Sequence, residues 1–142
     1  MAGSQRPFRV LFACVGNSAR SQMAEGLCRA LSADGVICKS GGSKPAGRLQ
    51  PQAVSAMAER GIDISHHQSK PIDEQFAADA DLIVVMGCGD DACPAFLGKP
   101  LEDWDLADPK GGSLEAVRQV RDDIERRVRR LLNARGLLRA GA

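Results

Sequence analysis

The sequence predicts a single α/β domain whose parallel sheet is covered by helices on both faces. Short apolar runs alternate with segments of helical periodicity, which is typical of that class. The length of 142 residues suits one domain with a real core. We find no internal repeat, low-complexity segment or linker, so residues 1–142 are treated as one domain.

The expected strands are short apolar runs. They cover Phe8–Ala13, Val36–Ser40, Leu82–Met86 and a short last strand, Pro100–Trp104. The run Leu82–Met86 (LIVVM) has the strongest strand character in the chain. Parallel sheets bind ligands beyond the carboxyl ends of their strands, and Cys14 directly follows the first strand.

The expected helices show apolar residues at helical spacing. They are a helix carrying Met23, Leu27, Ala30 and Leu31, then Pro51–Arg60, Ile72–Ala80 and Glu115–Asn133. The last has the apolar stripe Val117, Val120, Ile124, Val128, Leu131 and Leu132. Its arginines alternate with Asp122, Asp123 and Glu125, which indicates a solvated face rather than a nucleic-acid site.

The composition is that of an ordinary globular protein, with 44 % hydrophobic and 26 % charged residues. A net charge of +1 recruits neither nucleic acid nor membrane, and we expect neither as a partner. No apolar run approaches the roughly 20 residues of a membrane span. The short polar stretch Met1–Pro7 has no secretory apolar region behind it, which favours a cytoplasmic location.

The five cysteines are too few and too unevenly spaced for a secreted disulfide scaffold. In a reducing compartment we expect thiols unless chemistry oxidises them. Cys28 lies in the first helix and Cys38 in the second strand, where we expect free, buried thiols that pack as small apolar side chains. Cys14, Cys88 and Cys93 lie in loops and remain available for chemistry.

The segment Cys14–Ser21 lies between a strand and a helix, and its residue types suit an anion site. Backbone N–H groups in such a turn form a nest that faces the positive end of the helix. Gly16 permits close approach and Asn17 tolerates a left-handed conformation. Arg20 offers two donors to a tetrahedral anion. We expect the anion to be bound by the loop residues Val15, Gly16, Asn17, Ser18, Ala19, Arg20 and Ser21.

A cysteine in this position is expected to be a nucleophile. A helix N-terminus and a nearby arginine both favour the thiolate form, so Cys14 could attack the bound oxyanion. Ser18 and Ser21 can donate to the thiolate or cap the helix. Displacement also needs a proton for the leaving oxygen, and Asp108, followed by Pro109, is the candidate general acid.

The longer run Cys14–Gly26 (CVGNSARSQMAEG) resembles the arsenate reductase branch of the low-molecular-weight tyrosine phosphatase fold. The segments 43–47 (SKPAG) and 61–65 (GIDIS), and Trp104 with Asp108-Pro109, resemble it too. The resemblance extends from about Phe8 to Leu132. It implies a four-stranded parallel sheet, with Cys14 as nucleophile, Arg20 as oxyanion clamp and Asp108 as acid.

The resemblance also implies an activity. Arsenate would be reduced to arsenite through a Cys14 adduct and a disulfide relay of Cys14, Cys88 and Cys93. Thioredoxin, a glutaredoxin-like protein or a small thiol would then restore the thiols, with no bound cofactor and no metal. Two features depart from the pattern, since Ala19 replaces a frequent second cysteine and only four residues separate Cys88 from Cys93.

A third departure concerns a cation site. Some members of the family bind potassium through an asparagine, a glutamate, a serine and an aspartate. Asn17, Glu25 and Ser40 match the first three positions, but Lys70 stands at the fourth. We therefore expect the Lys70 ammonium to occupy the place of the cation.

Two alternatives stay open. A low-molecular-weight tyrosine phosphatase, acting through a phosphocysteine intermediate, would share Cys14, Arg20 and Asp108. Such enzymes usually place aromatic residues around the pocket, whereas this chain has no tyrosine. A non-enzymatic zinc module would use Cys88, Cys93 and the pair at 66–67 (His-His), but that spacing is loose for zinc.

Overall fold

The computed structural model describes residues 6–86, 100–107, 109 and 112–142. All the expected helices and strands form. In chain order they are β1 (Phe8–Cys14), α1 (Arg20–Leu31), β2 (Val36–Gly42), α2 (Pro51–Ala58), α3 (Glu74–Asp79), β3 (Leu82–Val85), β4 (Leu101–Asp103) and α4 (Leu114–Asn133). The structure thereby confirms the α/β class.

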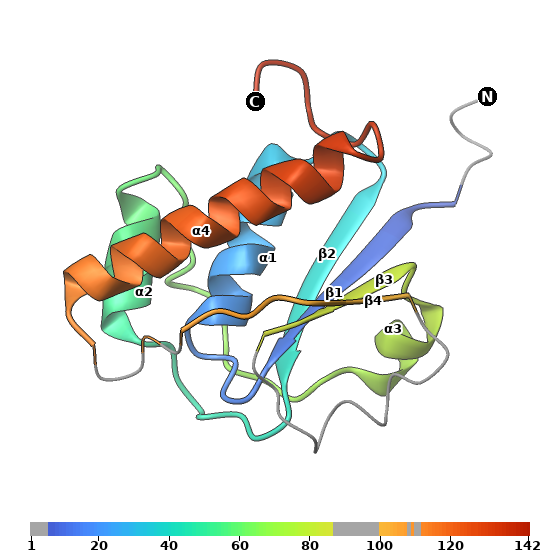
Figure 1. Cartoon of the computed structure of the whole chain (residues 1–142). Coiled ribbons are helices and arrows are strands. Elements are labelled where there is room, and N and C mark those ends of the chain that lie inside the picture. Colours follow the sequence, from blue (N-terminus) through green and yellow to red (C-terminus); the bar gives the residue numbers. More distant parts are fainter. Residues whose placement is uncertain (1–5, 87–99, 108, 110–111) are drawn as a thin grey trace.

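The four strands form one parallel sheet in the order β2-β1-β3-β4 (Figure 1). The expected four-stranded parallel sheet is confirmed. Because β1 is central, its carboxyl end lies between those of β2 and β3, with Cys14 paired to Gly42 and Ala13 to Val85. This edge of the sheet therefore presents Cys14 between two neighbouring loops.

Helices cover both faces of the sheet. Residues Val10 and Phe12 of β1 pack with α1, α2 and α4 in the larger core, and Trp104 lies 5.9 Å from Phe12 between ring centres. Leu11 and Ala13 point to the other face, where a smaller core includes Phe76 of α3. Successive side chains of β1 thus point alternately into the two cores, and its residues 10–13 are fully buried.

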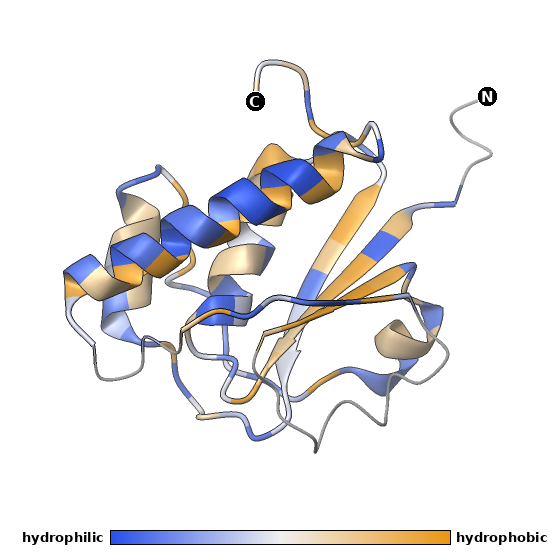
Figure 2. Ribbon diagram, in the orientation of Figure 1, coloured by the Kyte–Doolittle hydropathy of each residue, from blue (hydrophilic) through white to orange (hydrophobic). Residues whose placement is uncertain are grey.

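Helix α4 is amphipathic: its apolar stripe packs in the larger core with α1 and α2, and its hydrophilic side faces outward (Figure 2). Its arginines pair with acids as the interleaved sequence predicts. Arg127 contacts Asp123 at 2.9 Å and Arg129 contacts Glu125 at 3.1 Å, each one helical turn apart. No helix in the described part of the chain is long and apolar enough to cross a membrane.

Two expectations need correction. The helix expected at Ile72–Ala80 begins at Glu74, because the Asp73 side chain accepts a hydrogen bond from Phe76 N–H and caps it. The expected free thiols at Cys28 and Cys38 are wrong, because the structure joins them in a disulfide between α1 and β2. Their Cα atoms are 6.2 Å apart, within the usual disulfide range.

Candidate active site

Cys14 ends β1, and its thiol is almost fully buried at 2 % exposure. The Ser21 hydroxyl lies 2.9 Å from its Sγ, and the backbone N–H of Asn17 donates to Sγ at 3.3 Å. The Asn17 side-chain amide donates to Ser21 Oγ at 2.7 Å, which leaves the Ser21 hydroxyl proton free to donate to the sulfur. Two donors therefore support a thiolate at Cys14.

The N-terminus of α1 faces the same loop. The helix begins at Arg20, Ala19 provides no side-chain cap, and the first turn of the helix contains no acid. The start of a helix is its positive end, and its first backbone N–H groups point away from the helix, which is the arrangement that binds anions. Asn17 adopts the expected left-handed conformation, with φ of 49°, which turns the loop into an anion nest.

A cavity of about 290 Å³ opens over this loop, and it is large enough for a small tetrahedral anion. It is lined by Cys14, Val15, Gly16, Ser18, Ala19, Arg20, Lys44 and Ala46. The structure thus brings Cys14 and Arg20 into one pocket. Asn17 and Ser21, which we also expect to contact the anion, are fully buried and are not among these lining residues.

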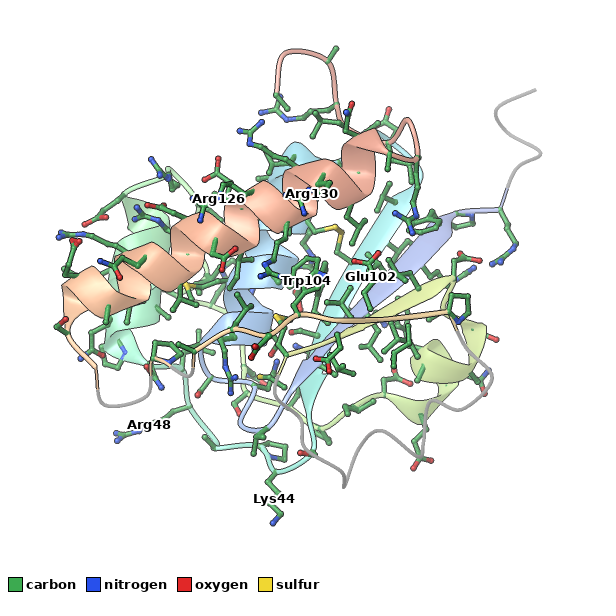
Figure 3. All side chains as sticks on the ribbon, viewed as in Figure 1. Lys44, Arg48, Glu102, Trp104, Arg126 and Arg130 are labelled. Carbon is green, nitrogen blue, oxygen red and sulfur yellow. A yellow bond between two sulfur atoms is a disulfide. The ribbon has the colours of Figure 1, made fainter. Side chains whose placement is uncertain are left out.

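The sequence analysis did not identify Lys44 and Ala46 as pocket residues. Their segment runs beside the loop that follows Cys14, and the N–H groups of Lys44 and Ala46 donate to the carbonyls of Val15 and Gly16, each at 2.9 Å. The motif at 43–47 was visible in the sequence, but only this backbone pairing reveals its role. Figure 3 shows Lys44 and Arg48 projecting outward from this segment, and of the two Lys44 lines the pocket and adds a positive charge there.

Close approach of β2 to the loop depends on Gly42. A Cβ atom at this position would lie 2.5 Å from the Val15 carbonyl oxygen. Because that neighbour is backbone, the contact could be relieved only by moving the loop. The end of β2 therefore helps to fix the position of the nest.

A buried polar network supports the loop from behind. The Asn17 amide also donates to Ser40 Oγ at 3.0 Å, and its Oδ1 accepts from Gln22 Nε2 at 2.9 Å. Ser40 in turn donates to Glu25 Oε1 at 2.6 Å. These contacts satisfy the polar atoms of Asn17 and hold it in its left-handed conformation.

Lys70 joins this network, at the place where we expected its ammonium to replace a cation. Its Nζ donates to Ser40 Oγ at 3.2 Å and lies 3.5 Å from Glu25 Oε1. Its backbone N–H donates to Asn17 Oδ1 at 3.0 Å. The ammonium therefore contacts two of the three side chains that match the expected cation ligands, Ser40 and Glu25, and the backbone of Lys70 contacts the third, Asn17.

His67 adds a titratable group that the sequence did not reveal as part of the site. Its Nδ1 lies 2.9 Å from Gln22 Oε1, which can only accept, so this nitrogen bears the proton. Burial lowers the pKa of His67; the Glu25 carboxylate opposes this shift, while His66, Arg29 and Lys70 add to it. A neutral imidazole suits this position, because it needs no counterion.

Three expected catalytic residues, Asp108, Cys88 and Cys93, lie outside the described residues. The zinc hypothesis rests on the same two cysteines. Within the described ranges no three His, Cys, Asp or Glu side chains come together as metal ligands would.

The chain was compared with known proteins. Residues 9–139 match the family described as low molecular weight phosphotyrosine protein phosphatase. A glutaredoxin arsenate reductase from Synechocystis is 41 % identical over 126 residues, covering 87 % of this chain and 95 % of that protein.

Solved structures give the same picture. An arsenate reductase in a phosphate-binding state superposes with a TM-score of 0.81 at 40 % identity, covering 89 % of this chain and 98 % of that one. An arginine phosphatase from Geobacillus stearothermophilus has a TM-score of 0.81 at 31 % identity, with coverages of 90 % and 92 %. A thioredoxin-dependent arsenate reductase from Corynebacterium glutamicum has a TM-score of 0.79 at 32 % identity, with coverages of 92 % and 63 %.

Proposed function

The chain belongs to the low molecular weight phosphotyrosine protein phosphatase family, and we propose that it is an arsenate reductase whose nucleophile is Cys14. The observation that carries this proposal is the setting of the Cys14 sulfur. It receives donors from Ser21 and Asn17 in a pocket that also contains Arg20 and the uncapped start of α1. A thiolate and an oxyanion can meet only where positive charge and donors offset their repulsion.

The first step forms a bond between sulfur and arsenic. The Cys14 thiolate attacks arsenate, one oxygen leaves, and Asp108 protonates it so that it departs as water. The Arg20 guanidinium and the loop N–H groups hold the remaining oxygens. The product is a Cys14–arsenate adduct in which arsenic is still pentavalent.

Reduction then requires two electrons, which a second thiolate supplies. Cys88 attacks Cys14 Sγ, the sulfur–arsenic bond breaks, and its electron pair leaves with arsenic as arsenite. A Cys14–Cys88 disulfide remains. Cys93 attacks Cys88 by thiol–disulfide exchange, which frees Cys14 and leaves Cys88–Cys93 for an external dithiol to reduce.

The pocket wall favours arsenate over an aryl phosphate. Its described lining includes Lys44 and Ala46 but no aromatic side chain that could stack on a phenyl ring. The chain also has no tyrosine. The names of the Synechocystis and Corynebacterium proteins support arsenate as substrate and a thioredoxin-class or glutaredoxin-class protein as reductant. A cytoplasmic location remains our prediction.

The direct test compares three activities of one preparation. We expect arsenate-dependent oxidation of thioredoxin or glutaredoxin, with little hydrolysis of an aryl phosphate or of phosphoarginine. Hydrolysis of the aryl phosphate or of phosphoarginine with no arsenate-dependent oxidation would make the protein a phosphatase. Inorganic phosphate and sulfate should inhibit competitively, because both are tetrahedral anions.

Two variants test the assigned roles. Cys14→Ser should abolish reduction while keeping the melting temperature, since a hydroxyl preserves the size of the side chain. Arg20→Lys should lower kcat/KM at least about a hundredfold, because an ammonium cannot form the two parallel bonds of a guanidinium. Turnover by Cys14→Ser close to that of the wild type would exclude nucleophilic catalysis by Cys14.

A further inference from the structure

The Cys28–Cys38 disulfide lies at the end of a ladder of contacts between α1 and β2. On the helix, Ser21, Glu25 and Cys28 are spaced so that they share one face. On the strand, Ser40 and Cys38 are two residues apart and point the same way. The Glu25–Ser40 hydrogen bond is therefore the neighbouring rung, and Asn17 connects that rung to Ser21 and Cys14.

A second contact ties the disulfide to the same network. Arg29 donates from Nε and Nη2 to the Cys38 carbonyl, both at 3.3 Å. Its Nη2 also lies 2.9 Å from Glu25 Oε2. A continuous path of hydrogen bonds and one ion pair therefore leads from Cys38 to the Cys14 sulfur, by way of Arg29, Glu25, Ser40, Asn17 and Ser21.

We propose that the Cys28–Cys38 disulfide is a redox-controlled positioning element, which fixes the α1–β2 spacing and thereby the donors that activate Cys14. When the bond is intact, the helix and the strand are held at one spacing, and the hydrogen bonds of the ladder are formed. When it is reduced, α1 gains freedom relative to β2 and the donors to Cys14 become less well fixed. The part that concerns Cys14 rests on the proposed function.

Formation of the Cys28–Cys38 bond requires an oxidant, and another disulfide can serve as one. The two thiols of Cys28 and Cys38 react with one disulfide, such as glutathione disulfide, to give the protein disulfide and two thiols. Two electrons and two protons pass from the protein to the oxidant. Cys28 is 0 % exposed and Cys38 2 %, so exchange requires a transient opening of α1 from β2. The intact bond is thereby shielded from the reductant that serves Cys88 and Cys93.

The first experiment asks whether the bond forms and stabilises the protein. The full chain carrying Cys88→Ser and Cys93→Ser is folded in a glutathione redox buffer, so that only Cys14, Cys28 and Cys38 remain. Peptide mapping should find Cys28 joined to Cys38. The melting temperature should exceed that of the same chain with Cys28→Ala and Cys38→Ala by roughly 5–10 °C, as for a short closed loop. Absence of the bond in the folded protein would overturn the proposal.

The second experiment asks whether the bond acts on Cys14. The rate of Cys14 alkylation by iodoacetamide is measured from pH 5 to 9 in both proteins. Without the disulfide we expect the profile to move to higher pH and the rate at neutral pH to fall roughly two- to fivefold. An unchanged profile would mean that the disulfide only stabilises the fold, and it would contradict the positioning role.

A matched variant separates positioning from simple loss of stability. Leu31 is a buried residue at the end of α1 that takes no part in the ladder. Leu31→Ala should lower the melting temperature but leave the alkylation profile of Cys14 in place. If it shifts that profile as far as loss of the disulfide does, the effect is one of general loosening and the proposal is wrong. None of these readouts uses arsenate, so a failure of the proposed activity would be seen separately.

Discussion

Two polar networks of this protein differ in depth. The network that supports the loop after Cys14 joins five residues that are at most 3 % exposed: Asn17, Ser21, Gln22, Glu25 and Ser40. The ion-pair network between α4 and the residues that follow α2 is more exposed, although Arg121 itself is buried. There Arg118 contacts Glu59 at 2.7 Å, Arg121 contacts Glu59 at 2.7 Å, and Arg60 contacts Asp122 at 2.8 Å.

The two networks differ in whether water can take the place of a partner that is lost. A buried hydrogen bond that loses one partner leaves the other unsatisfied, whereas an exposed ion pair that loses one partner leaves a hydrated charge. Short distances in the surface network therefore do not imply large contributions to stability. The buried network should govern both the stability and the shape of the anion nest.

Asn17 should give the largest effect of the substitutions below. Asn17→Ala removes the side-chain hydrogen bonds and places alanine at a φ of 49°, so we expect a loss of about 2–4 kcal/mol in unfolding free energy. Asn17→Gly loses the same bonds but tolerates the conformation, and should cost less than alanine by about 1 kcal/mol. Urea unfolding of both variants separates the cost of the lost hydrogen bonds from the cost of the left-handed conformation. Equal stability of Asn17→Ala and wild type would refute the supporting role.

His67 should make the buried network sensitive to pH. Since its pKa is lowered in the folded protein, the unfolded chain binds the proton first as pH falls. Stability that is present above pH 6.5 is then lost as the pH falls below that value. Urea midpoints between pH 8 and 5 should show this decline. It should flatten in His67→Gln but largely persist in His66→Gln, which alters the exposed neighbour; equal slopes in all three proteins would exclude His67 as the cause.

Lys70 should make the protein indifferent to potassium. Its ammonium contacts Ser40 and Glu25, so no place is left for a cation there. Melting temperatures in potassium and in sodium chloride at equal ionic strength should agree within about 1 °C. A clear, potassium-specific increase would show that Lys70 does not fill the site.

Glu59 should give the smallest effect at neutral pH. Hydrogen bonds from Arg118 and Arg121 lower the pKa of Glu59 to about 2, yet the group is exposed and screened by solvent. Glu59→Gln should shift the melting temperature at pH 7 by only one or two degrees. Because the pKa is lowered, its contribution is present above about pH 4.5 and lost as pH falls toward 2, so wild type and variant should converge in acid. A large loss at pH 7 would contradict the contrast between the networks.

The sequence predicts the parts of the site that depend on local chain geometry. Cys14 ends a strand, Arg20 begins the next helix, and the short loop between them contains Gly16 and Asn17. Alternation along the strand and helical spacing along the helix suffice to place that loop. The left-handed conformation of Asn17 follows from its residue type and its position in the turn. The fold class follows from the same periodicities.

Contacts between distant segments could not be predicted in this way. Cys28 and Cys38 are ten residues apart, and nothing in that spacing says that the two side chains face each other across α1 and β2. Lys44 enters the pocket only through backbone pairing with Val15. His67 reaches the network through Gln22, which a helical pattern marks only as polar. Such contacts depend on how helices and loops are set against the sheet.

The most direct test of the central claim is to trap the disulfide on Cys14. The full-length protein is treated with arsenate in the absence of any reductant, digested, and mapped by mass spectrometry. We predict a Cys88–Cys93 disulfide in the wild type and a Cys14–Cys88 disulfide in Cys93→Ser, with neither formed when phosphate replaces arsenate. Normal turnover of Cys88→Ser with thioredoxin or glutaredoxin as the sole reductant, or no arsenate-dependent disulfide on Cys14 in Cys93→Ser, would contradict the mechanism.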